Sequence, residues 1–303
     1  MKFFAVSAVF VSAISGALSA SLYLVGDSTM ASHKASEGIE GWGVPLNNYL
    51  TGITLVNKAV SGRSARSYWR EGKWAAVQAS LKSGDFVEHL LKRDNSLPSP
   101  QSILRLWFNP PPHFCVALDR HDSTRTRIPT VIEFGHNDGG SPSTSDRASV
   151  VGEGSETQKV TLSDGTVETV YTWPTYVKWM IDGAKSKGAT PIISSTTPNN
   201  PFEGVSKINY TPGRFVTYAK NAAAAKGVPY VDHFTASLLY YDKLGKGVTE
   251  SYFPNDHTHT NAAGANAVAW AFLSALRCPS AKGVLSQYIN SSGQGAGARC
   301  TAP

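Results

Sequence analysis

The sequence predicts a three-layer α/β/α sandwich in which a central parallel sheet lies between two layers of helices. Short runs of apolar and β-branched residues alternate with segments of helical pattern along the 303-residue chain. This alternation is typical of a parallel sheet covered on both faces. Hydrophobic residues make up 41% of the composition and no internal repeat is visible, so one domain with one sizeable core is expected.

The expected elements follow one another in a regular order. Strands are predicted, in chain order, over residues 22–25, 53–56, 131–134, 191–194 and 230–231. Helices are predicted over residues 74–81, 173–187, 214–226 and 262–276. Parallel sheets carry their sites at the carboxyl ends of the strands, so the polar residues that follow each strand are the candidates for function.

Residues 1–20 have the features of a secretory signal peptide. A single early lysine precedes an apolar run that ends in small residues, and cleavage is expected just before Ser21 or Leu22. No later segment has the roughly 18 uninterrupted apolar residues that a transmembrane helix requires. We therefore expect residues 21–303 to form a soluble, secreted domain without membrane association.

Cysteines and sequons agree with export. In an oxidising compartment the simplest pairing joins Cys278 to Cys300 and leaves Cys115 over. An N-glycosylation sequon begins at Asn290, and a weaker one, followed by proline, begins at Asn209.

The charge balance bears on the class of partner. The net charge of +6 favours acidic partners, but the chain lacks the dense Lys/Arg blocks that would indicate nucleic acid. An acidic polysaccharide fits this charge as well. A monomer is the default expectation.

One tract, residues 88–130, does not fit the predicted fold. Residues 83–87 begin like a buried strand and residues 131–135 continue like one, but the tract between them is rich in proline and arginine without a clear period. A structureless loop of this length is unusual inside a compact domain. We hypothesise that it is translated intron or a gene-model error, which transcript sequencing would refute by finding these codons in mature message. If present, the tract splits a core strand, and destabilisation and aggregation are expected.

The first candidate block, Gly26-Asp-Ser-Thr29, follows the first strand. A small residue there permits a tight turn that places Ser28 near a helix N-terminus with its hydroxyl at the strand end, where a nucleophile belongs. An ordinary helix cap is the alternative. After the second strand, Gly62 lies in a loop where its backbone N–H could approach a ligand closely, or where the glycine serves only a turn.

The block Gly135-His-Asn-Asp138 follows the third strand. Asn137 can offer a fixed amide donor there. The alternative is an Asx turn that Asn137 and Asp138 make with Gly139-Gly140.

The block NDHTHT at residues 255–260 precedes the last predicted helix. Asp256 lies three residues before His259, so a carboxylate can orient an imidazole. The alternative is a zinc site formed by Asp256, His257, His259 and His136. No HExxH-type helix accompanies these residues, and the serine supplies a nucleophile without a metal.

These four blocks stand in the order of the SGNH/GDSL hydrolases, which the sequence resembles. Within that superfamily the segments YLVGDSTMA, NKAVSGRSARS, IEFGHNDGG and FPNDHTHTN look like fungal rhamnogalacturonan acetylesterases, as does the tract SETQKVTLSDGTVETVYTWPTYVKWMI. The resemblance covers nearly the whole chain after the signal peptide except residues 88–130. It implies a flavodoxin-like SGNH fold and a secreted esterase that removes acetyl groups from rhamnogalacturonan in pectin.

The resemblance also implies roles for single residues. Ser28 would be the nucleophile, His259 its general base and Asp256 the residue that holds the imidazole. The N–H groups of Ser28 and Gly62 and the side chain of Asn137 would form the oxyanion hole. No cofactor and no metal are expected.

Substrate binding is expected near Gly62. Arg63 and Arg66 are the candidates, because cationic and aromatic residues are interleaved there, a mixture suited to carboxylated sugars. A solvated basic helix face over core tryptophans is the alternative.

Three other functions stay open. A non-catalytic polysaccharide-binding protein would leave a simple acetyl ester intact. Another SGNH esterase or a lipase would show a different acyl-chain preference, and a zinc hydrolase would lose activity to chelators.

Overall fold

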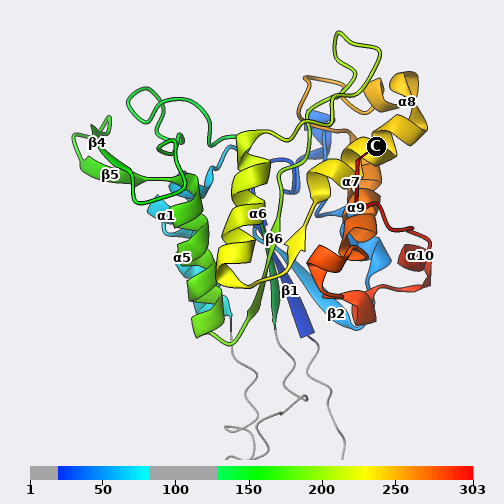
Figure 1. Cartoon of the computed structure of the whole chain (residues 1–303), viewed down its shortest axis with the longest axis horizontal. Coiled ribbons are helices and arrows are strands. Elements are labelled where there is room, and N and C mark those ends of the chain that lie inside the picture. The colour runs from blue at the N-terminus through cyan, green and yellow to red at the C-terminus, as the bar shows by residue number, and fades with distance from the viewer. Residues whose placement is uncertain (1–19, 82–127, 303) are drawn as a thin grey trace, which may run out of the picture.

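A five-stranded parallel sheet forms the centre of the computed structural model, which describes residues 20–81 and 128–302 (Figure 1). The strand order is β2-β1-β3-β6-β7. In chain order the strands are β1 (Ala20–Gly26), β2 (Ile53–Asn57), β3 (Pro129–Glu133), β6 (Thr190–Ser194) and β7 (Tyr230–Val231). All five expected strands are present, which confirms the predicted parallel sheet.

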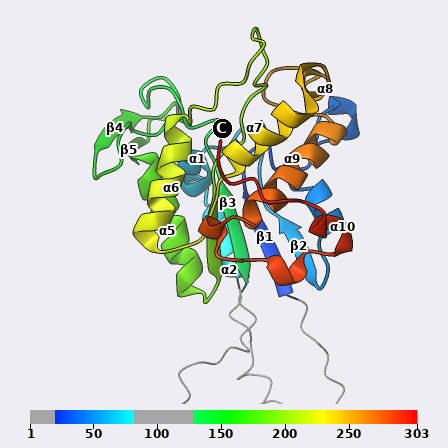
Figure 2. The same cartoon turned by 45° about the vertical axis from the view of Figure 1, so that its right-hand side comes forward.

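Helices cover both faces of this sheet (Figures 1 and 2). Tyr23 and Val25 of β1 pack against one apolar cluster and Leu22 and Leu24 against the other, as the period-2 alternation of a strand requires. The first cluster involves α1 (Ala65–Arg70), α2 (Lys73–Ser80), α5 (Trp173–Ser186) and α6 (Arg214–Lys226). The second involves α7 (His233–Leu244) and α9 (Ala262–Leu276). The predicted three-layer sandwich is therefore confirmed.

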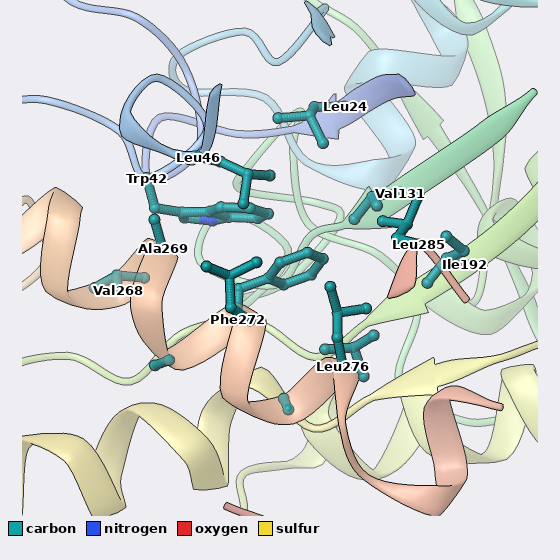
Figure 3. Packing of buried hydrophobic residues seen from close by; sticks show 14 of the residues in the cluster. Leu24, Trp42, Leu46, Val131, Ile192, Val268, Ala269, Phe272, Leu276 and Leu285 are labelled. Atoms are coloured by element: carbon teal, nitrogen blue, oxygen red, sulfur yellow. The ribbon is translucent and has the colours of Figure 1, made fainter. Parts of the chain in front are cut away.

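The cluster under α9 centres on two stacked aromatic rings (Figure 3). The rings of Trp42 and Phe272 lie 4.7 Å apart between centroids. Leu24, Val131 and Ile192 of three neighbouring strands pack into the same cluster. Helix α9 is apolar over most of its length, and 11 of its 15 residues are buried where it packs against α7 and β7.

Several elements were not anticipated. The largest is an antiparallel hairpin of β4 (Thr157–Thr161) and β5 (Val167–Tyr171), in which only Val160 and Val170 are buried. Helices α1 and α7 were not anticipated either. The other additional helices are short: α8 (Lys246–Glu250), α10 (Ser291–Gln294), η1 (Ala35–Glu37), η2 (Pro45–Tyr49), η3 (Pro279–Ala281) and η4 (Ser286–Tyr288).

Two expected boundaries need correction. Ala20, assigned to the signal peptide, is the first residue of β1 and pairs in register with Ile53. Pro129 and Thr130, assigned to the anomalous tract, begin β3 because they continue its register against β6. The rest of the signal peptide, the expected strand at residues 83–87, Cys115 and the rest of the tract to residue 127 lie outside the described residues.

The C-terminal segment is joined to α9 by the Cys278–Cys300 disulfide, which confirms the expected pairing. Asn290, the first residue of the stronger sequon, caps α10 by accepting from the Gly293 N–H and donates to the Asn48 carbonyl. Over residues 20–81 and 128–302, no helix is both long and apolar enough to cross a membrane.

Candidate active site

The candidate nucleophile lies in the turn that follows β1. Gly26 ends this strand where β3 comes close: a Cβ added there would lie 2.7 Å from the Glu133 carbonyl oxygen. Asp27 shapes the turn by accepting hydrogen bonds from both the N–H and the hydroxyl of Thr29. Ser28 is consequently held at the carboxyl edge of the sheet, with 7% of its surface exposed.

Ser28, His259 and Asp256 form one line of hydrogen bonds. The Oγ of Ser28 lies 2.8 Å from Nε2 of His259, and Nδ1 of the same ring lies 2.7 Å from Oδ2 of Asp256. The loop before α9 carries both residues, and Asn261 ends that loop by capping the helix through the Gly264 N–H. The structure therefore brings together the three residues that the sequence singled out at opposite ends of the chain.

The Asp256 carboxyl is set to remain ionised. Burial acts to raise its pKa, but hydrogen bonds from the His259 N–H, the His259 ring and the Thr258 N–H outweigh burial and lower the pKa to about 2. An ionised Asp256 accepts the proton of His259 Nδ1, which leaves Nε2 free to accept from the Ser28 hydroxyl. This is the protonation state that a general base needs.

The three expected oxyanion donors lie in the turns that follow β1, β2 and β3. Gly62 has a φ of +73°, a left-handed backbone that favours glycine. Neither the Ser28 N–H nor the Gly62 N–H donates to any described residue. The Asn137 amide joins them from the turn after β3. The oxyanion hole expected from these three groups stays a prediction.

The Asn137 side chain is held at both ends. Its Nδ2 donates to the Arg63 carbonyl at 3.2 Å, and its Oδ1 accepts from Arg147 Nη1 at 2.9 Å. Arg147 stands outside the four blocks, so no sequence motif points to it.

The side chain of Asp138 contacts a residue that is distant in sequence. Its buried side chain accepts the Ala65 N–H at 2.8 Å and so ties the turn after β3 to the start of α1. Burial raises the pKa of the Asp138 carboxyl well above its ordinary range, and the nearby Asp27 carboxyl raises it further. An Asx turn alone does not account for this contact between distant residues.

The expectation that Arg66 binds substrate is wrong. Its side chain is fully buried and forms an ion pair with Glu168, with Nη2 and Oε2 2.6 Å apart. Its Nη1 donates to the carbonyls of Ser145 and Ala148. Arg63, in contrast, keeps 37% of its side chain exposed and pairs with Glu71.

The other histidines have separate partners. His257 pairs with Glu203 at 3.1 Å, and His136 contacts the Thr197 hydroxyl at 3.0 Å. His33, which the sequence analysis did not single out, contacts the Ser28 carbonyl through Nε2 at 2.8 Å. In the part of the chain that the structure describes, no group of three or more His, Cys, Asp or Glu side chains could hold a metal ion.

The parallel sheet and the order of the four blocks along it place the chain among hydrolases of the SGNH fold. The crystal structure of the Bacillus subtilis protein YxiM shares the fold, with a TM-score of 0.57 and 18% identity over 88% of this chain. This chain spans 57% of the length of that protein.

Sequence comparison is more specific. No protein-family model matches the chain. Rhamnogalacturonan acetylesterase from Emericella nidulans is 40% identical over 268 residues, which cover 88% of this chain and 89% of the relative. A probable rhamnogalacturonan acetylesterase from Bacillus subtilis, YesY, is 23% identical over 254 residues, 82% of this chain and 88% of the relative. The chain belongs to the rhamnogalacturonan acetylesterase family, a family of carboxylic ester hydrolases.

Proposed function

We propose that the protein is a secreted serine esterase that removes acetyl groups from rhamnogalacturonan through an acyl-enzyme. The observation that carries the proposal is the line of hydrogen bonds from Asp256 through His259 to the Ser28 hydroxyl. Such a line makes a weak hydroxyl nucleophile reactive, because the histidine acts as a general base that accepts its proton.

The first half of the reaction transfers the acetyl group to the enzyme. His259 Nε2 takes the proton of Ser28 as Oγ bonds to the acetyl carbonyl carbon. The carbonyl oxygen becomes an oxyanion, which the N–H groups of Ser28 and Gly62 and the Asn137 amide stabilise. The bond to the sugar oxygen then breaks, and His259 gives its proton to the departing hydroxyl. Asp256 remains ionised and stabilises the intervening imidazolium.

The second half returns the enzyme to its starting state. Water replaces the sugar, His259 takes a proton from it, and the new oxygen bonds to the acetyl carbon. Collapse breaks the bond to Ser28 Oγ, which recovers its proton from His259, and acetate leaves. All of these steps use residues of this chain and water.

The substrate part of the proposal draws on the relatives and on charge. The Emericella nidulans relative bears the name rhamnogalacturonan acetylesterase. The net charge of +6 and the exposed Arg63 suit a polymer with carboxylated sugars. Export is supported by the signal-peptide pattern of the first residues and by the Cys278–Cys300 disulfide.

Acetate release from acetylated rhamnogalacturonan tests the proposal, with Ser28→Ala as the control. The assay should include the full chain and a version without residues 88–130, because that deletion brings Phe86 and Val87 into the places of Pro129 and Thr130 in β3. Ser28-dependent release by either protein supports the proposal. Two folded but inactive proteins would overturn it in favour of a polysaccharide-binding role. A preference for long acyl chains on aryl esters would favour a lipase instead.

A further inference from the structure

We propose that Arg147 is a positioning residue of the oxyanion hole, which orients the Asn137 amide and places positive charge beside it. The proposal rests on the esterase function proposed above. Its starting observation is that one guanidinium nitrogen, Nη1, lies 2.9 Å from Asn137 Oδ1 and 3.5 Å from the Gly62 carbonyl oxygen. The guanidinium thus contacts Gly62 and Asn137, the two expected oxyanion-hole residues other than Ser28.

The orientation of the Asn137 amide decides whether it can stabilise an oxyanion. Its two ends have nearly the same shape, but only Nδ2 donates hydrogen bonds, and an Oδ1 turned toward the oxyanion would repel it. Arg147 has only donors and therefore selects Oδ1, whereas the Arg63 carbonyl has only lone pairs and selects Nδ2. Rotation of the amide by 180° would lose both contacts. One N–H of Nδ2 serves Arg63, and the second remains for the substrate.

The charge of Arg147 is also distinctive. Three neighbouring arginines have carboxylate partners: Arg63 with Glu71, Arg66 with Glu168 and Arg70 with Asp146. Arg147 forms no ion pair with any residue in the described ranges, and its charge acts on the buried Asp138 carboxyl only by lowering the pKa that burial raises. A guanidinium beside two oxyanion donors favours the negatively charged transition state over the neutral ester.

The backbone that carries Arg147 is firmly held although its side chain is exposed. The buried Arg66 donates to the carbonyls of Ser145 and Ala148, on either side of Arg147. The Ser149 N–H donates to the Asp138 carbonyl, next to Asn137. These contacts fix the distance between the two ends of the loop, so Arg147 reaches Asn137 from a rigid base.

Hydrolysis of an aryl acetate by Arg147→Met tests the proposal, since this substrate has no carboxylate for the arginine to bind. We expect kcat to fall about 10- to 100-fold, less than the roughly 10²- to 10³-fold loss on removing an oxyanion donor itself, with KM and thermal midpoint little changed. Arg147→Lys keeps the charge and a donor and should restore part of kcat. Arg70→Met is the matched control, because Arg70 contacts the same loop at Asp146 without touching Asn137.

A double-mutant comparison separates the possible explanations. If Arg147 acts through Asn137, adding Arg147→Met to Asn137→Ala should lower kcat less than threefold further. A full additional loss, an equal loss in Arg70→Met, or a change confined to KM for the pectic polymer would each overturn the proposal. If the wild type is active in a Ser28-dependent way and Arg147→Met has the same kcat, only the role of Arg147 is refuted. If the wild type is folded but inactive, the proposed esterase function is refuted as well.

Discussion

The indole N–H of Trp42 donates a 2.9 Å hydrogen bond to the carboxylate of Glu133, although 91 residues separate the two in sequence. The same buried carboxylate accepts from the Ser194 hydroxyl and lies 2.9 Å from Nδ1 of His233. His233 contacts the Val268 carbonyl through its other nitrogen. Glu133 pairs in register with Gly26, so this polar network links β3, β6, α7 and α9 next to the nucleophile turn.

Replacing Glu133 with glutamine should therefore destabilise the fold strongly. An amide cannot accept all the bonds that the carboxylate accepts, and it leaves buried donors unsatisfied. We expect a loss of about 3 kcal/mol in unfolding free energy, seen as a lower urea midpoint with an unchanged slope. Glu250→Gln on the surface is the control. A loss below about 1 kcal/mol would show that the network is not needed.

Arg66 is expected to contribute to stability through the loop that it holds. Arg66→Met leaves Glu168 without its buried partner and should lower the unfolding free energy by about 3 kcal/mol. The double variant Arg66→Met with Glu168→Met should lose less than the single one, because the single variant leaves the largely buried Glu168 with only the 3.3 Å contact to Arg70. Urea unfolding of both checks this. An equal or greater loss in the double variant would contradict it.

The sequence predicts the sheet, four of its covering helices (α2, α5, α6 and α9) and the Ser28, Asp256 and His259 cluster, because these depend on local patterns and ordered blocks. It misses α1 and α7. It does not predict the β4–β5 hairpin, whose strands lack an apolar face. Nor does it predict the burial of Arg66, which depends on Glu168, 102 residues further along the chain. The sequence also does not predict the contact between Arg147 and Asn137, because the conformation of a loop brings the two residues together.

The low pKa of Asp256, about 2, predicts a specific dependence of stability on pH. A carboxyl whose pKa is lowered on folding contributes stability above its unfolded pKa, near 3.8, and loses that contribution as pH falls toward 2. The difference in thermal midpoint between wild type and Asp256→Asn should thus be constant above about pH 5 and shrink below about pH 4. At neutral pH the same variant should lose on the order of 10³- to 10⁴-fold in kcat. A stability difference that grows on acidification would refute this assignment.

Gly62→Ala should lower kcat, whereas an equally destabilising substitution away from the site should not. The left-handed backbone at this position costs alanine about 1–2 kcal/mol, while the nearest atom to the new Cβ is 3.9 Å away. Gly52 has a similar φ of +68° with open space around it, so Gly52→Ala is a matched control. Both variants should lose similar stability, and only Gly62→Ala should lower kcat for an aryl acetate. Equal kcat values would show that turnover does not depend on the glycine side of this left-handed turn.

The disulfide should stabilise the C-terminal segment against the rest of the domain. Cys278 and Cys300 are separated by 22 residues, and closing a loop of this size stabilises by about 3 kcal/mol. Serine at both positions should lower the unfolding free energy by that amount, measured by denaturant titration without reductant. A matching loss in wild type after reduction provides the control, and no change in either case would contradict the prediction.

The position of β1 between β2 and β3 has a consequence for synthesis on the ribosome. β1 is the first strand of the sheet to be made, and β2 can cover one of its edges soon afterwards, but its other edge waits for β3, which begins only at Pro129. At roughly 5–20 residues per second, the chain between β2 and β3 takes several seconds to emerge, during which that edge has no native partner. Unpaired strand edges recruit other chains. Every residue placed between α2 and β3 lengthens this interval, so the yield of soluble protein should respond to the length of that segment before enzymatic activity does.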